Sequence, residues 1–306
     1  MVNRSILVGA AIAVLTGSGC VPARSTTPVA ASSLAAAPSS AAATTSNPEP
    51  GTPRERPELN EYFNTEQVSG TIALLDSADS VLTCSNVSLC KRPTIPASTF
   101  KIANSMIALE TGVVEDAETV LPGDGKPYPV EEWNHNNTLR SALRVSCVPC
   151  FQGIARKIGE TRMKDWVTKL DYGNHEVTGG IDHFWLSGGL RISPLQQIDF
   201  LHRFDGGKLP ISARTVETVK DIITLDVGQN HVLRGKTGLQ QPPDFPELAG
   251  WFVGWLELGN RRVYFATLIN ACKKGIDIKP VRRRVTERVL RALQLLPADA
   301  TRTPNE

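Results

Sequence analysis

Three short motifs carry residue types that could attack an amide carbonyl: Ser98-Thr99-Phe100-Lys101, Ser146-Cys147-Val148 and Lys236-Thr237-Gly238. Residues three apart lie on one side of a helix, so Lys101 could activate the hydroxyl of Ser98 as a nucleophile. Pro96-Ala97 indicates that Ser98 lies near a helix start, where free backbone N–H groups and the helix dipole favour developing negative charge. A nucleophile, a base and an oxyanion donor could thus come from one turn.

Each motif alone is weak evidence. About one Ser-x-x-Lys pattern is expected by chance in a chain of ordinary composition, and Ser88-Leu89-Cys90-Lys91 also fits. We expect this second copy in a turn between two strands, without a helical context. Lys-Thr-Gly is rarer. Lys236-Thr237-Gly238 is expected to end a strand beside the nucleophile, where Lys236 and Thr237 could meet an anionic group of the substrate.

The hydrophobic pattern predicts the elements that position these motifs. Strands near both ends of the folded part, with helices between them, indicate an α+β or α/β fold. Its central antiparallel sheet is built from both termini and flanked by helices, and an inserted helical region forms one wall of a cleft. The expected strands are 69–76, 80–84, 231–236, 250–257 and 262–270, with a turn at 258–261. The expected helices are 98–109, 149–158, 194–204, 213–223 and a last helix with the apolar face Val281, Val285, Val289, Leu293 and Leu296.

The composition argues against several classes of function. The chain has 306 residues, 41% of them hydrophobic, which allows one sizeable core or two. A net charge of +2 argues against nucleic-acid binding. The five histidines form no pair at metal-ligand spacing, and no glycine-rich nucleotide loop occurs. We therefore expect no metal and no organic cofactor.

The first residues are typical of an export signal. Residues 1–20 contain the basic Arg4, the apolar segment 6–15 and then Gly17-Ser18-Gly19-Cys20. The pattern is equally compatible with lipidation of Cys20 and with plain cleavage further on. Residues 21–57 are rich in Ala, Ser, Thr and Pro, which indicates a disordered tether. We expect a catalytic domain at 58–297, a disordered tail at 298–306, a periplasmic location, and membrane contact only through a lipid at Cys20.

Six cysteines fit an oxidising compartment. Cys84 and Cys90 flank a short loop between predicted strands, and we expect a disulfide between them. Cys147 and Cys150 lie one helical turn apart, and small buried fillers are favoured there over a disulfide. Cys272 has no obvious partner.

Further motifs accompany these three over nearly all of residues 69–296. They are Pro96–Ile102, Leu109–Gly112, Ser146–Pro149, Phe151-Gln152 with Ala155-Arg156, Tyr172-Gly173-Asn174, Gly179–Asp182, Phe184-Trp185-Leu186, Lys236–Gly238 and Gly254-Trp255. Together they resemble the class D, or oxacillinase-type, serine β-lactamases. The resemblance implies the β-lactamase and penicillin-binding transpeptidase fold.

The resemblance also implies a role for each matched residue. Ser98 would attack the β-lactam carbonyl, Lys101 would be N-carboxylated by CO2 and act as general base, and Ser146 would relay a proton. Trp185 would hydrogen-bond the carboxylated lysine. The remaining implied roles are apolar walls for Val148 and Leu186, substrate binding for Lys236, Thr237, Gly238 and Arg282, an oxyanion hole from the N–H groups of Ser98 and Leu239, and loop positioning for Tyr172, Gly173 and Asn174.

Elementary chemistry is consistent with the carboxylated lysine. Only a neutral amine reacts with CO2, and burial lowers the pKa of a lysine because it disfavours the charged form. The indole N–H of Trp185 could donate to the resulting anion. Taken singly, Ser146 could instead be a helix N-cap, Trp185 a core residue, and Arg282 part of a solvated run of three arginines.

The leading hypothesis is hydrolysis of β-lactam antibiotics such as penicillins, which would give resistance. One alternative is a penicillin-binding protein or sensor domain that is acylated and then stops, because the same motifs serve both. Another is a silent lipoprotein that binds cell-wall peptides. The segment 239–248 is expected to border the cleft and control access by bulky substrates. Monomer and homodimer both stay open.

Overall fold

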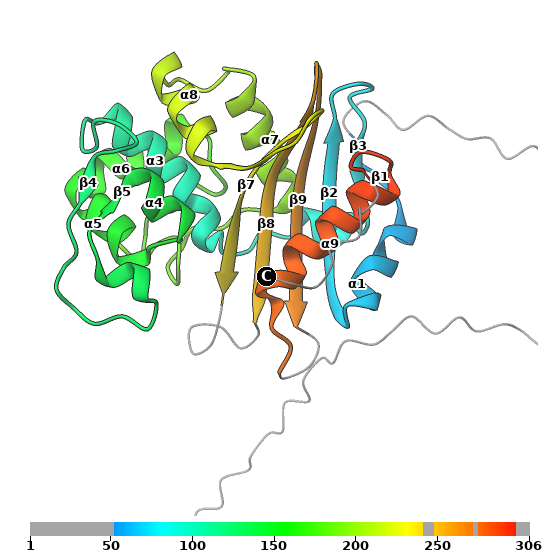
Figure 1. Ribbon diagram of the computed structural model, residues 1–306, viewed down its shortest axis with the longest axis horizontal. Coiled ribbons are helices and arrows are strands. Elements are labelled where there is room, and N and C mark those ends of the chain that lie inside the picture. The colour runs from blue at the N-terminus through cyan, green and yellow to red at the C-terminus, as the bar shows by residue number, and fades with distance from the viewer. Residues whose placement is uncertain (1–51, 241–247, 272–274, 298–306) are drawn as a thin grey trace, which may run out of the picture. The chain divides into compact units, whose positions relative to one another are not determined.

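The computed structural model describes residues 52–240, 248–271 and 275–297, all within the compact unit Thr45–Glu306 (Figure 1). The expectations for the export signal, Cys20, Cys272, the tail 298–306 and most of the segment 239–248 lie outside these residues. No helix in the described part of the chain is long and apolar enough to cross a membrane.

A seven-stranded sheet forms the centre of the unit, with strand order β1-β3-β2-β9-β8-β7-β6. Neighbouring strands are antiparallel except β1 and β3, which are parallel. Strands from the two ends of the unit meet where β2 pairs with β9, which confirms the expected sheet. The strands are β1 (Arg54–Glu55), β2 (Val68–Asp76), β3 (Leu82–Cys84), β6 (Thr224–Val227), β7 (Val232–Gln240), β8 (Ala249–Leu258) and β9 (Arg261–Ala271).

Strand β7 is longer than predicted. It continues past Lys236 to Gln240 because its later residues stay in register with β8, where Gly238 faces Trp251. The Lys236-Thr237-Gly238 motif therefore lies inside a strand rather than at its end. The predicted turn between β8 and β9 is confirmed, and Gly259 takes a φ of 59° there, a conformation that suits glycine.

The helical region is inserted between β3 and β6, as expected. Helix α7 packs against one face of the sheet, and α1 and α9 cover the other face (Figure 1). The inserted elements are α2 (Val87–Lys91), η2 (Ala97–Phe100), α3 (Lys101–Glu110), β4 (Val120–Leu121), η3 (Glu131–Asn134), β5 (Asn137–Thr138), α4 (Leu139–Arg144), α5 (Val148–Ile158), α6 (Glu160–Lys169), α7 (Pro194–Asp205) and α8 (Ala213–Ile222). Outside the insertion lie η1 (Pro57–Asn60), α1 (Glu61–Thr65) and α9 (Ile278–Ala292).

Side chains on the two faces of the sheet alternate along each strand and contribute to two hydrophobic cores. Phe252 and Leu256 of β8 pack with Val285 and Val289 of α9 in one core. Trp251, Val253 and Trp255, on the opposite face of the same strand, join the core that the helical insertion shares with the sheet. Strand β8 is therefore buried on both faces, which makes the sheet a rigid support for the motif on β7.

Two short elements differ from the predicted boundaries. The last residues of the expected tether are ordered, because β1 pairs with β3 and the N–H of Arg56 donates to Cys84 O at 2.8 Å. The second Ser-x-x-Lys copy lies in helix α2 rather than in a turn, because Asn86 caps that helix through Leu89 N–H. Ser88 and Lys91 are both exposed there. This copy therefore differs from the first in its exposure to solvent and not in the absence of a helix.

Both disulfide expectations were wrong. Cys84 and Cys90 are free, buried thiols, because the Cys90 sulfur lies 3.2 Å from Thr71 Oγ1 and 3.7 Å from Ile72 O, held toward β2. Cys147 and Cys150 instead form a disulfide, with Cα atoms 5.4 Å apart. Cys147 caps the start of α5, which turns its side chain back along the first turn toward Cys150.

Candidate active site

Ser98 lies in the 3₁₀ turn η2, directly before α3 begins at Lys101. The preceding Ala97 is buried and has a φ of 49°, a left-handed conformation that a non-glycine residue adopts only when its surroundings hold it there. Thr99 supports the turn because its Oγ1 donates to Pro96 O at 2.8 Å. The expected α-helix 98–109 is thus confirmed from Lys101 onward, with the nucleophile on a tight, strained entry turn.

The sheet holds the turn η2 in place through hydrogen bonds to Ile95. Trp251 Nε1 donates to Ile95 O at 2.8 Å, and Gln240 Nε2 donates to the same carbonyl. A Cβ atom on Gly238 would lie 3.0 Å from Pro96 O and 3.3 Å from Trp251 Cβ. The glycine of the Lys-Thr-Gly motif therefore allows β7 to approach the nucleophile turn closely.

Lys101 is completely buried and faces two serines. Its Nζ lies 2.7 Å from Ser98 Oγ and 3.4 Å from Ser146 Oγ. Burial, reinforced by the positive charge of Lys236, lowers the pKa of Lys101 well below its ordinary value. Burial therefore favours the neutral, basic form of the amine next to the nucleophile.

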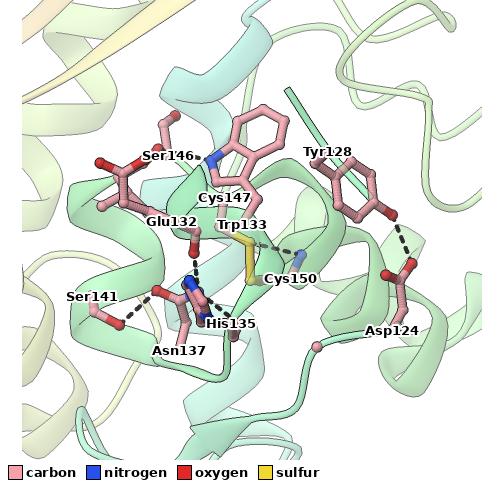
Figure 2. The surroundings of a disulfide bond; sticks show 12 residues. Asp124, Tyr128, Glu132, Trp133, His135, Asn137, Ser141, Ser146, Cys147 and Cys150 are labelled. Atoms are coloured by element: carbon pink, nitrogen blue, oxygen red, sulfur yellow. Dashed lines mark hydrogen bonds between the residues drawn. A yellow bond between two sulfur atoms is a disulfide. The ribbon is translucent and has the colours of Figure 1, made fainter. Parts of the chain in front are cut away.

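Ser146 lies at the junction between α4 and α5 and has a φ of 55°. Lys236 Nζ donates to its Oγ at 3.1 Å, so the hydroxyl bridges the two lysines. The structure thus brings together Ser98, Lys101, Ser146 and Lys236, which are distant in the sequence. Ser146 is not a helix N-cap, because Cys147 caps α5 instead (Figure 2).

A second positive group lies beside Lys236. Arg282 of α9 donates to Gly238 O, and its Nε is buried with no partner among the described residues. Burial lowers the pKa of Lys236 to about 7, with a further contribution from Arg282, and burial lowers the pKa of Arg282 to about 10. Arg283 and Arg284 are exposed and pair with carboxylates, so only the first arginine of the run faces the site. Thr237 and Leu239 are half-buried on β7.

Trp185 is completely buried, and its indole Nε1 has no hydrogen-bond partner among the described residues. Its ring lies 5.6 Å from that of Phe100, the residue before Lys101. Leu186 and Val148 are half-buried. A buried N–H donor without an acceptor is costly. A carboxylate attached to Lys101, which follows Phe100 in the chain, would be a suitable acceptor, so these residues fit that modification.

Tyr172, Gly173 and Asn174 hold the loop that carries Trp185. Asn174 accepts the N–H of Arg191 at 2.8 Å and donates to Gly189 O at 3.0 Å. A Cβ atom on Gly173 would lie 2.1 Å from Arg191 O, and its φ of 61° also favours glycine. These contacts give the motif the positioning role inferred from the sequence.

Sequence reasoning missed several residues that support the site. Gln197 of α7 donates to Thr99 Oγ1 at 2.9 Å and to the buried Tyr172 hydroxyl at 3.3 Å. With Gln240 and Trp251, it anchors the nucleophile turn. A buried glutamine on a predicted apolar helix face was the available signal. In the described ranges, no group of three or more His, Cys, Asp and Glu side chains could hold a metal ion.

The comparisons with known proteins agree with this geometry. Residues 57–291 match the family model of the penicillin-binding protein transpeptidase domain. β-Lactamase OXA-48 from Klebsiella pneumoniae is 35% identical over 244 residues, which cover 80% of this chain and 91% of that protein. The regulatory protein BlaR1 from Bacillus licheniformis is 34% identical over 227 residues, covering 74% of this chain but 37% of BlaR1.

A solved structure extends the likeness to three dimensions. The class D β-lactamase YbXI from Nostoc has a TM-score of 0.75 and 40% identity, and the match covers 78% of this chain and 99% of that one. The motifs that carried the resemblance lie within the matched domain, and Ser98, Lys101, Ser146 and Lys236 from three of them meet at one centre. The chain therefore contains a penicillin-binding transpeptidase domain and belongs to the class D serine β-lactamases.

Proposed function

We propose that the protein hydrolyses β-lactam antibiotics, with penicillins and oxacillin-type compounds as substrates, through an acyl-enzyme on Ser98. One observation carries the proposal: the Ser98 hydroxyl lies 2.7 Å from a fully buried lysine amine. Because burial lowers the pKa of that amine and so favours its neutral form, it would accept the proton that Ser98 must lose to become a nucleophile.

The first half of the reaction would open the lactam ring. Ser98 Oγ bonds to the carbonyl carbon, its proton moves toward Lys101, and the oxyanion is stabilised by the N–H groups of Ser98 and Leu239. The carbon–nitrogen bond then breaks. Ser146 donates its proton to the departing nitrogen and is recharged along its contacts with the two lysines, at 3.4 Å from Lys101 and 3.1 Å from Lys236.

The second half would release the product. A water molecule attacks the ester carbonyl, the bond to Ser98 Oγ breaks, and the serine regains a proton. A carboxylate added to Lys101 from CO2 would supply an anionic general base there. Trp185 would hold that carboxylate by its unpartnered N–H, within apolar walls from Val148 and Leu186. The lowered pKa of Lys101 supports this part of the proposal, since only the neutral amine reacts with CO2.

The substrate would be oriented by its own carboxylate. Lys236, Thr237 and Arg282 would bind that group, and the buried Nε of Arg282 has no partner in the described part of the chain. A negatively charged group would restore the charged form of Lys236, whose pKa is lowered to about 7. This recognition requires no metal and no organic cofactor.

One alternative has a specific observation in its favour. The likeness to the regulatory protein BlaR1 supports a domain that is acylated on Ser98 but not released. The two functions differ in the second half-reaction alone. We favour hydrolysis, because the lowered pKa of Lys101 favours its carboxylation and the unpartnered Trp185 N–H could hold the carboxylate that serves as the base for deacylation.

The cellular setting is also a proposal. The leader at residues 1–20 supports export to the periplasm, Cys20 would be the site of any lipid attachment, and hydrolysis there would give β-lactam resistance. Expression of the full chain, and of a Cys20→Ala variant, would be followed by cell fractionation and growth on a penicillin. Export predicts activity in the periplasm or membrane fraction; activity confined to the cytoplasm would refute it.

The function is tested by penicillin hydrolysis with a matched pair of serine variants. Ser98→Ala is expected to abolish turnover, because the nucleophile is lost. Ser88→Ala removes the exposed serine of the second Ser-x-x-Lys copy and is expected to keep full turnover. Equal activity of Ser98→Ala and the wild type would refute the proposal, whereas a stable Ser98 adduct without turnover would favour the sensor alternative.

A further inference from the structure

The junction that carries Ser146 is held in an unfavourable backbone conformation. Ser146 has a φ of 55°, in the left-handed region that non-glycine residues avoid. It follows the last turn of α4 and immediately precedes Cys147, which caps α5. A hydroxyl on such a residue keeps its place only if the chain is fixed on both sides of it.

Hydrogen bonds fix the side toward α4. The N–H of Ser146 donates to Leu143 O at 3.2 Å, and the N–H of Cys147 donates to Ala142 O at 2.8 Å. Trp133 Nε1 donates to Val145 O at 3.1 Å, and its indole lies beside the junction in Figure 2. The end of α4 is therefore secured by three hydrogen bonds.

The side toward α5 depends on sulfur. Cys147 Sγ accepts the N–H of Cys150 at 3.2 Å, but sulfur is a weak acceptor and cysteine is not a favoured N-cap residue. The covalent bond between Cys147 and Cys150 supplies what that cap lacks. It ties the residue next to Ser146 to the first turn of α5 (Figure 2).

The bond is also open to reagents. Cys147 is completely buried, whereas Cys150 is half-exposed. Cys150 lines a cavity of about 110 Å³ together with Trp133, Pro149 and Asp124. A small thiol can therefore approach the disulfide from the Cys150 side without unfolding the domain.

We propose that the Cys147–Cys150 disulfide is a positioning element for the Ser146 hydroxyl, and that its reduction slows acylation of Ser98. The inference rests on the proposed function, because it assumes that Ser146 carries a proton during ring opening. Reduction by a dithiol breaks the sulfur–sulfur bond and takes up two electrons and two protons. The dithiol becomes a cyclic disulfide, and Cys147 and Cys150 become thiols.

The test measures the single-turnover rate of Ser98 labelling by a fluorescent penicillin in bicarbonate-saturated buffer. The full chain is compared before and after dithiothreitol, with the bond state read by mass spectrometry. We expect at least a fivefold fall in the rate on reduction, an unchanged apparent affinity within twofold, and recovery on reoxidation with oxidised glutathione. The labelling rate of Cys150→Ala is expected to equal that of the reduced wild type. Dithiothreitol is expected to leave this rate unchanged, although the other cysteines of the variant remain.

A second variant separates positioning from general damage. In Ser146→Ala the hydroxyl is absent, so reduction is expected to leave the residual labelling rate unchanged. An undiminished rate in reduced wild type would overturn the inference, and so would an equal fall in Ser146→Ala. Failure of the proposed function looks different, because the oxidised wild type would then form no Ser98 adduct at all.

Discussion

Replacing Trp185 by phenylalanine tests how the buried lysine becomes a base. The substitution keeps an aromatic ring but removes an indole N–H that is buried without a partner among the described residues, on a ring 5.6 Å from that of Phe100. If this N–H binds a carboxylate on Lys101, the variant loses a hydrogen bond to a charged group. Such a bond contributes roughly 1.5–3 kcal/mol, so the affinity for CO2 is expected to fall about 10- to 100-fold.

The same loss of CO2 affinity also lowers the free energy of unfolding that CO2 binding adds. At a CO2 concentration about 100 times its dissociation constant, the wild type gains about 2.7 kcal/mol in its free energy of unfolding. A variant that binds about 30-fold more weakly gains about 0.9 kcal/mol under the same conditions. The difference of about 1.8 kcal/mol corresponds to about 4 to 7 °C in Tm for a domain of this size.

The assay is thermal unfolding and penicillin turnover, both titrated with bicarbonate from decarbonated buffer. The smaller phenylalanine also leaves a cavity, but that cost is present with and without bicarbonate and cancels in the difference. Trp255→Phe is the matched control, because Trp255 is equally buried and its Nε1 already donates to Glu257 Oε1 at 3.0 Å. The control is expected to keep the full bicarbonate response.

One result would refute the reasoning. If Trp185→Phe showed the same bicarbonate-dependent rise in Tm and the same half-saturation of turnover as the wild type, Trp185 would not hold a carboxylate. A loss of stability that is equal with and without bicarbonate would leave Trp185 with a packing role alone.

Three further predictions concern the substrate end of the site. The pKa of about 7 at Lys236 predicts that kcat/KM for penicillin falls as pH rises through neutrality, and Lys236→Arg should move this alkaline limb upward in a pH profile. Gly238→Ala places a methyl group 3.0 Å from Pro96 O and should lower kcat/KM roughly tenfold and also lower Tm, because the added group overpacks this contact; unchanged kinetics would contradict the close approach of β7. Arg282→Ala should raise KM about 10- to 100-fold by removing charge-assisted hydrogen bonds, whereas a change in kcat alone would argue against substrate binding.

Acid pH should act through Lys101. Its pKa lies well below the ordinary value because the charged form is desolvated, so the neutral amine persists to a lower pH than in an exposed lysine and is lost as pH falls. Turnover is therefore expected to decline on the acid side, and added bicarbonate should restore part of it. An acid-side decline in turnover that bicarbonate does not change would contradict the role of the carboxylate.

The long helices and strands were predictable from the regular spacing of their apolar residues. Strands β2, β8 and β9 and helices α5, α7 and α9 each contain enough apolar residues at a regular spacing to be recognised. Helix α2 has five residues and depends on the Asn86 cap, so it offered no period to read. Strand β1 exists only through its pairing with β3, a contact that no local pattern encodes.

The centre of the site was predictable because its chemistry is concentrated in short motifs. The residues that hold the nucleophile turn were not, because Gln197, Gln240 and Trp251 reach it from 98 to 156 positions away in the sequence. The prediction of the cysteine pairing was wrong for a similar reason, because it also depends on contacts outside the local sequence. Cys84 and Cys90 lie close together, but contacts with β2 hold the Cys90 thiol, whereas the cap of α5 directs Cys147 toward Cys150.

Lys101, buried and open to carboxylation by CO2, is proposed to act as the base in both halves of a catalytic cycle on Ser98. The most direct measurement is the number of penicillin molecules turned over per enzyme, with and without bicarbonate, in the wild type and in Lys101→Ala. Many turnovers are expected in the wild type, at a rate that rises with bicarbonate, and none in the variant. A single stoichiometric burst that leaves a stable adduct on wild-type Ser98, whatever the bicarbonate concentration, would contradict it.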